Sequence, residues 1–305
     1  MPAGFVFLAK SDAAAAAAAR NVAAFSRHSP RAQRCLALAD GLVAPTDAEA
    51  LFDTVMTIAE PGSAAFVAEA VLEAPFDRVI VVDAGVWCVG SLYDVFAGLR
   101  DRPLAAAPSP FAPYTDMAGP RTIAEPEAAP AMTPPLEGYL VGFNRTLLST
   151  ACIEVWRRFA QHADAEGAPF PANAAARALM AQERISLHAL PSGLVVNSAA
   201  PAFLRGFVRA VVHTPHAERD AFAAFINHDR RPRLFVPPAT LLVQDQKAGV
   251  WRVLGFDRGR VLVLGEAEMA DFTPYLHALG ASFGAAHGWR PPPEQPQAAK
   301  AKTRA

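Results

Sequence analysis

Cysteine, net charge and long apolar runs are all scarce in this chain of 305 residues. Its three cysteines, Cys35, Cys88 and Cys152, are odd in number and widely spaced, which argues against a disulfide framework and against a CxxC metal site. This usage fits a reducing compartment, and we expect a cytoplasmic protein. No apolar segment of about 18 residues is free of charge and proline, so we predict no membrane span.

The charges of the chain nearly cancel, because 28 basic residues stand against 29 acidic ones. The net charge of -1 gives no electrostatic reason to expect a nucleic-acid partner, although local arginine clusters could still bind small anions. The first residues, MPAGFVFLAKSDA, have no basic lead, and Lys10 and Asp12 interrupt their short apolar run. We therefore predict that they form a first strand and not a signal peptide.

Several catalytic signatures are missing as well. The chain has no GxGxxG after its first strand, no P-loop GxxxxGK and no HExxH, which excludes the usual dinucleotide, P-loop and zincin sites. A sugar-phosphate nucleotidyltransferase would carry a glycine-rich loop where this chain reads AKSDAAA, and a phosphatase with an aspartyl nucleophile would carry a second Asp at Gly85. One GxSxG match, Gly280 to Gly284, ends an expected helix, whereas a nucleophile elbow needs a strand before its serine, so we interpret it as a chance match.

Short apolar runs alternate with helical stretches in the first part of the chain. Residues 4–10 predict a strand buried on both faces, and the alanine-rich residues 12–27 predict a helix capped by Ser11 or Asp12. The further expected elements are strands at 34–40 and 79–82, helices at 47–58 and 63–73, a helical turn from Ser91, and a strand in LAAAP. This alternation predicts an α/β fold with a doubly wound, mostly parallel sheet.

The later part of the chain is less regular. The expected elements are a long surface loop at 108–135, a strand at 136–144, helices at 146–161 and 171–182, and short strands in RISLHALP and FVRAVVHTPH. After Pro237, TLLVQD, GVWRVLGFD and RVLVLGEAE alternate apolar and polar residues around a DRG turn, which predicts an antiparallel meander followed by a helix at 269–283. We expect a domain at 1–236, a small β-rich extension at 237–290 and a disordered tail at 291–305.

The stretch FDRVIVVDAG, residues 76–85, predicts a buried strand that ends at Asp83. In an open parallel sheet, ligands bind in the crevice outside the carboxyl ends of the strands, so Asp83 is a candidate to face a ligand. The alternative is that Asp83 caps or closes the turn after the strand. His213 and His216 pose a similar choice, since an HxxH pair at a strand end can ligate a metal or can be structural.

Five stretches of the chain resemble the landmarks of the nucleotide-diphospho-sugar glycosyltransferases with the A-type fold. The opening GFVFLAKSDA resembles their first strand and helix, and FDRVIVVDAGVWCVGSLYDVF resembles their strand ending in Asp-x-Asp. LEGYLVGFNRTLLSTACIEVWRRF is similar to their Asn-x-Gly segment with its following strand and helix, while HALPSGLVVNS and VRAVVHTPH resemble a turn with Asn and a strand ending in a metal-binding His. These stretches keep the family's order over roughly residues 4–216, which implies the A-type glycosyltransferase fold.

The resemblance implies transfer of a sugar from a nucleotide-diphosphate sugar, of the UDP or GDP type, to an unknown acceptor. In the family a divalent cation, manganese or magnesium, neutralises the leaving diphosphate, and oxygen ligands with one imidazole suit such an ion. By the resemblance, Asp83 contacts the ribose or the metal, His213 binds the metal or the diphosphate, and Ala9 and Lys10 lie beside the base. Asn197 matches the family's turn asparagine, for which a purely structural role is an equal alternative.

This sequence departs from the family's pattern at three places. Gly85 stands where the second, metal-chelating Asp is expected, Glu137-Gly138-Tyr139 replaces Asn-x-Gly in the sugar pocket, and Pro171-Ala172 replaces Asp-Gln. Two alternatives follow: a metal-independent enzyme in which arginines or Lys10 offset the phosphate charge, or a catalytically inactive binding or interaction module. Another carboxylate in the space left at Gly85, from Glu137 or Asp116, would favour the enzyme.

Two arginines and two tryptophans complete the candidates. Arg205 and Arg209 lie near the possible phosphate site, and the alternative is that they are solvated surface residues. Trp87 and Trp156 are expected to be core or pocket-wall aromatics.

Overall fold

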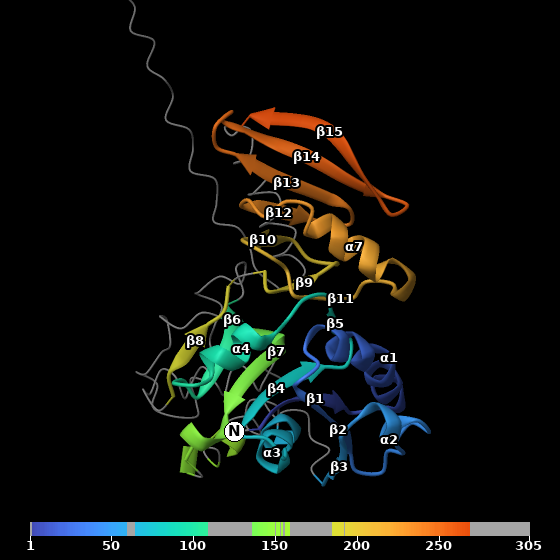
Figure 1. Ribbon diagram of the computed structural model, residues 1–305, viewed down its shortest axis with the longest axis vertical. Coiled ribbons are helices and arrows are strands. Elements are labelled where there is room, and N and C mark those ends of the chain that lie inside the picture. The colour runs from blue at the N-terminus through green and yellow to red at the C-terminus, as the bar shows by residue number, and fades with distance from the viewer. Residues whose placement is uncertain are drawn as a thin grey trace, which may run out of the picture.

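A seven-stranded sheet with the order β3-β2-β1-β4-β7-β6-β8 forms the lower part of the molecule in Figure 1. The computed structural model describes residues 2–59, 65–108, 136–149, 151, 152, 154, 156–158, 185–191 and 193–268. The strands of this sheet are β1 (Ala3–Ala9), β2 (Gln33–Ala39), β3 (Thr54–Ile58), β4 (Arg78–Asp83), β6 (Leu104–Pro108), β7 (Leu136–Asn144) and β8 (Leu187–Ala189). Most neighbours run parallel, but β7 is antiparallel to both β4 and β6. The expected α/β class with a mostly parallel main sheet is thus confirmed.

Helices cover both faces of this sheet. α1 (Asp12–His28) and α4 (Tyr93–Gly98) share one apolar core with alternate residues of β1, while α3 (Ala65–Glu73) packs in a second core on the other face. Phe25 of α1 lies against the rings of Phe5 and Phe7, with centroids 5.0 and 4.9 Å apart. Each fully buried ring of this kind stabilises the fold by roughly 1.5–3 kcal/mol.

The first helix begins where its cap residue predicts. The hydroxyl of Ser11 accepts a 3.2 Å hydrogen bond from the backbone N–H of Ala14, and Asp12 places a negative charge in the first turn. The strand before it ends at Ala9, so only Lys10 and Ser11 separate the buried sheet from the helix.

The prediction of one helix over residues 47–58 was wrong. The helix α2 covers only Ala48–Leu51, and β3 follows at Thr54–Ile58. Four of the five residues of β3, all except Met56, favour the extended state because they are branched at Cβ, and the strand pairs in parallel with β2 along its whole length. Asp53, between the two elements, accepts two hydrogen bonds from the guanidinium of Arg34, each 2.9 Å long, which fixes the start of β3.

A three-stranded sheet of order β5-β11-β9 lies between the two larger sheets (Figure 1). It consists of β5 (Trp87–Cys88), β9 (Val195–Asn197) and β11 (Ala210–Val212), with β11 antiparallel to β5 and parallel to β9. β5 begins directly after the turn that contains Asp83, and β11 ends directly before His213. This small sheet therefore links the two residues that the family resemblance singles out.

An antiparallel sheet of order β10-β12-β13-β14-β15 forms the upper part of Figure 1. Its strands are β10 (Ala202–Leu204), β12 (Arg233–Val236), β13 (Thr240–Asp245), β14 (Val250–Asp257) and β15 (Arg260–Glu268). The expected meander after Pro237 is confirmed in β13 to β15, and two strands from before that residue join the same sheet. The helix α7 (Arg219–Ile226) packs on it, with the ring of Phe225 stacked on Phe256 at 5.1 Å.

Several expectations lie outside the described residues. They are most of the loop at 108–135 with Asp116, the helix at 171–182 with Pro171 and Ala172, the helix at 269–283 with its GxSxG match, and the tail at 291–305. Within the described part of the chain, no helix is both long and apolar enough to cross a membrane.

Candidate functional site

The carboxyl ends of β1 and β4 lie side by side at the point where the strand order reverses. From β1 the chain adds β2 and β3 on one side and then returns to place β4 on the other, so that Leu8 pairs with Asp83. In open parallel sheets this is where the crevice for a ligand forms. The structure therefore brings the segment of Ala9 and Lys10 to the end of the strand that delivers Asp83, as the sequence predicts.

Asp83 is exposed and also closes its own turn. One carboxylate oxygen accepts a 2.8 Å hydrogen bond from the N–H of Gly85, and the carbonyl of Asp83 accepts a 3.0 Å bond from the N–H of Val86. The turn role considered from the sequence is thus real. It does not use the whole side chain, because Oδ2 has no hydrogen-bond or ion-pair partner among the described residues.

Three residues form a polar cluster: Asn197 at the end of β9, His213 directly after β11, and Tyr139 within β7. The side-chain amide of Asn197 donates a 3.2 Å hydrogen bond to the hydroxyl of Tyr139, and that hydroxyl lies 3.4 Å from Nε2 of His213. The rings of Tyr139 and His213 meet edge to face, with centroids 5.7 Å apart. Sequence reasoning named two members of this cluster and counted Tyr139 only as part of a lost motif.

The backbone of His213 is unusual. Its φ angle is 58°, in the left-handed region that residues other than glycine rarely adopt. Such conformations persist only where the surrounding structure enforces them, and they concentrate at functional sites. Since the ring of His213 is exposed and contacts Tyr139, this position is a candidate for ligand contact.

A second layer of polar contacts supports the turn after β4. The side-chain amide of the buried Asn21 donates a 2.7 Å hydrogen bond to the carbonyl of Ala84. The guanidinium of Arg219 donates a 2.6 Å bond to the amide oxygen of Asn21 and a 3.1 Å bond to the carbonyl of Thr214. It also lies 5.2 Å from the ring of Trp87. One arginine therefore connects the residue after Asp83 with the residue after His213.

Sequence reasoning missed this supporting layer. The one available signal was a polar Asn21 inside the alanine-rich helix α1, where a buried amide needs a partner. Burial lowers the pKa of Arg219, and the neighbouring positive charge of Arg20 lowers it further. Trp87 is 9% exposed and lies beneath this arginine, which fits the pocket-wall role expected for it.

Gly85 is not required by the backbone of the turn. An ideal Cβ added there would lie 3.1 Å from Oδ1 of Asp83, which is the nearest described atom, and Gly85 does not have a positive φ. A side chain would therefore need a shift of only a few tenths of an ångström. The missing carboxylate at this position is a chemical difference from the family's motif and not a steric necessity.

The described residues contain no preformed cluster of three metal ligands. No group of three or more His, Cys, Asp or Glu side chains in that part of the chain is arranged to hold an ion. The backbone of Glu137 lies in β7 and that of His216 in the 3₁₀ turn η2 (His216–Glu218), but their side chains are outside the description. Asp83 and His213 remain the two candidates for a metal.

The two candidate phosphate-binding arginines already have partners. Arg209 makes a 3.2 Å ion pair with Asp94 and lies 5.3 Å from the ring of Phe207, while Arg205 lies 5.4 Å from the ring of Phe203. Arg205 follows β10 of the antiparallel sheet, and Arg209 precedes β11 of the small sheet. The contacts described for the two side chains do not include the Asp83 turn. Their arrangement favours a surface role.

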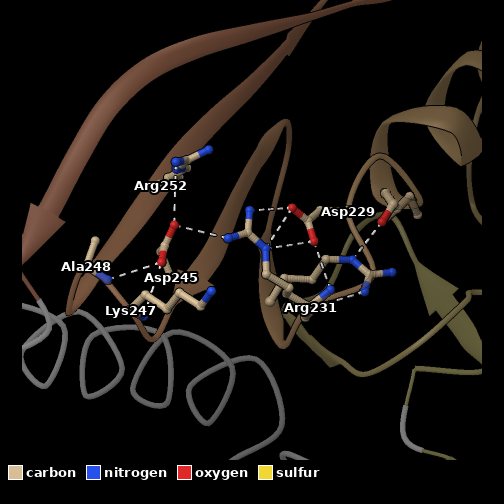
Figure 2. Close-up of polar contacts among 8 residues, drawn as sticks. Asp229, Arg231, Asp245, Lys247, Ala248 and Arg252 are labelled. Atoms are coloured by element: carbon tan, nitrogen blue, oxygen red, sulfur yellow. Dashed lines mark hydrogen bonds and ion pairs between the residues drawn. The ribbon is translucent and has the colours of Figure 1, made fainter.

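A second polar cluster lies in the antiparallel sheet, where Arg231 sits between Asp229 and Asp245 (Figure 2). Hydrogen bonds from Arg231 lower the pKa of Asp229, and the backbone N–H of Ala248 followed by Arg231 lowers that of Asp245. A pocket of about 210 Å³ beside the cluster is lined in part by Arg252. Arg231 and Arg252 already form ion pairs with the carboxylates of Asp229 and Asp245. We therefore interpret this cluster as a structural contact and not as a site for an anion.

No protein-family model and no curated protein matches this chain.

Proposed function

We propose that the chain is a glycosyltransferase-like protein with a doubly wound, A-type sheet, and that it binds a nucleotide-diphosphate sugar over the carboxyl ends of β1 and β4. The observation that carries the proposal is the pairing of Leu8 with Asp83 at the point where the strand order reverses. The small sheet runs from the Asp83 turn to the cluster of Asn197, Tyr139 and His213, which supports one continuous site.

Each group has a role in this proposal. The segment of Ala9 and Lys10 flanks the base, and Asp83 accepts hydrogen bonds from the ribose hydroxyls through its carboxylate. Lys10 supplies positive charge near the diphosphate, and the imidazole of His213, held beside Tyr139, contacts the diphosphate or the sugar.

The described residues offer too few donors to hold a manganese or magnesium ion alone, so the diphosphate of the bound nucleotide would have to supply further ligands. Magnesium is commonly held by one or two carboxylates together with substrate phosphates, so Asp83 with His213 would hold the ion jointly with the diphosphate. Such an ion would neutralise the leaving group when bound. If the site is metal-independent, Lys10 carries that role.

The second candidate function is a catalytically inactive module that keeps nucleotide affinity or binds another partner. Gly85 favours this alternative because it lacks the second carboxylate, and so does the use of one oxygen of Asp83 in closing its own turn. The two functions share the binding step and differ in turnover.

Calorimetric titration with UDP and with GDP, each with and without Mn²⁺, tests the proposal. Asp83→Asn removes the charge but keeps an oxygen that can accept the hydrogen bond from Gly85. Asp40→Asn is the matched control, because Asp40 follows β2 at the same edge and accepts a 2.9 Å bond from the N–H of Gly41. Nucleotide binding that Asp83→Asn weakens and Asp40→Asn preserves would support the proposal. Absence of binding to either nucleotide would contradict it.

A further inference from the structure

β15 is the outermost strand of the antiparallel sheet among the described residues. It is nine residues long and carries three consecutive apolar side chains that face solvent, Leu262, Val263 and Leu264, which are 42%, 78% and 60% exposed. An exposed, apolar edge strand is a template for pairing with a strand from another molecule unless it is protected. This edge, at the top of Figure 1, is therefore suited to an intermolecular contact.

We propose that two copies of this chain associate through antiparallel pairing of their β15 strands, with a twofold axis at Val263. Residues equidistant from the axis then face one another. Val263 meets its own copy, and Leu262 of each chain meets Leu264 of the other. Each of the three exposed apolar side chains loses part of its contact with water in one symmetric interface.

The charges on the strand select this partner. Arg260 and Glu266 are exposed, carry opposite charges, and lie three positions on either side of Val263. An antiparallel copy centred on Val263 places Arg260 opposite Glu266 twice, whereas a parallel copy in register places each charge beside its like. Opposite charges across a strand pair stabilise it and like charges destabilise it. The strand is therefore complementary to its own antiparallel copy.

An irregularity in β15 adds to this selectivity. Leu254 of β14 pairs with Val263 and Val253 pairs with Gly265, so Leu264 is an extra residue in β15. Bulges and charged residues at an edge discourage pairing with arbitrary strands. The contact involves few residues, which corresponds to a weak, concentration-dependent dimer.

Sedimentation velocity on the full chain over a range of concentrations tests the dimer. Arg260→Glu and Glu266→Arg should each weaken self-association about tenfold or more, because every single reversal creates two like-charge pairs. The double variant exchanges the charges and should restore association to within about threefold of wild type. Arg102→Glu, at an exposed arginine outside β15, is the control and should leave association unchanged. A wild-type chain that stays monomeric, or a double variant as weak as the singles, overturns the proposal.

Oxidative crosslinking gives a second, independent measurement. Val263→Cys places two thiols across the proposed axis and should yield a covalent dimer under mild oxidation. Val43→Cys is the matched control, since Val43 is 80% exposed in another part of the chain, and it should yield none. Equal crosslinking of the two variants contradicts the assignment. A dimer that forms only after removal of residues 269–305 would show that the chain's own segment occupies this edge, which also overturns the proposal.

Discussion

The side-chain amide of Asn21 donates a 2.7 Å hydrogen bond to the carbonyl oxygen of Ala84, the residue between Asp83 and Gly85. The two partners are 63 positions apart in the chain, and the amide is 1% exposed. Through Arg219, the same amide is connected to the carbonyl of Thr214, next to His213. A buried contact thus fixes the backbone of the turn that carries Asp83, while the side chain of Asp83 stays exposed and accessible to a ligand.

Loss of Asn21 should destabilise the fold. Asn21→Leu leaves the carbonyl of Ala84 and one N–H of Arg219 without this partner, and each unsatisfied buried group costs about 1–3 kcal/mol. We expect a drop of about 2–4 kcal/mol in the free energy of unfolding, measured by denaturant titration. The control Arg27→Ala changes an exposed residue of the same helix and should stay within about 0.5 kcal/mol of wild type. An Asn21→Leu variant as stable as that control would contradict this role.

A carboxylate at position 85 should strengthen metal-dependent nucleotide binding. Gly85→Asp adds an oxygen ligand next to Asp83, and the turn can accept a Cβ with a small shift. We expect the affinity for UDP in the presence of Mn²⁺ to rise about tenfold by calorimetry, which corresponds to about 1.4 kcal/mol. Gly85→Asn, with the same shape but no charge, should not reproduce the gain. If both variants bind alike, the carboxylate is not what the site lacks.

Acid should remove the contribution of Asp229 to stability. Hydrogen bonds from Arg231 lower the pKa of Asp229 below its ordinary value of 3.8 in the folded state. The folded chain therefore binds fewer protons than the unfolded chain between these two pKa values, so the stabilisation is full above pH 3.8 and is lost as the pH falls through the folded pKa. Asp229→Asn should lower the melting temperature at neutral pH, and its difference from wild type should shrink below pH 3.8. A difference that stays constant across this range would contradict the ion pair's role.

Two of the three cysteines should be unreactive in the native protein. Burial raises the pKa of both Cys35 and Cys88 to about 12, so at neutral pH neither thiol forms the reactive thiolate. Cys152 is only partly buried. Maleimide labelling followed by mass spectrometry should modify Cys152 first and reach the other two only after unfolding. Rapid native labelling of Cys88 would show that the small sheet opens readily.

Local signals made much of the main sheet predictable. Ser11 at the start of an alanine-rich stretch fixes the beginning of α1, and the apolar run that ends at Asp83 gives β4. The strand predicted at 136–144 has the same bounds in the structure. β3 was taken for part of a helix because its short segment follows helix formers; its Cβ-branched residues favour a strand, and its pairing with β2 decides between the two. Long-range pairing of this kind cannot be read from one segment.

The site residues at strand ends could be predicted from the sequence, whereas the contacts between distant segments could not. Asp83 could be named because strand ends are visible in the sequence. The contact of Tyr139 with His213 spans 74 positions and brings β7 beside the small sheet, so no local pattern reports it. Asn21 and Arg219 contact one another across 198 positions for the same reason. Residues such as Asn21 and Arg219 support the site through buried hydrogen bonds, and such contacts can be recognised only in the folded chain.

Backbone amide resonances measured during a titration with UDP test the central claim most directly, because they report where the nucleotide binds. The account predicts that the amides of Lys10, Gly85 and His213 shift together and saturate at one concentration, while that of Gly41, after the neighbouring strand β2, does not move. Shifts centred on the pocket beside Arg252, or no shifts at all, would contradict a nucleotide site at the ends of β1 and β4.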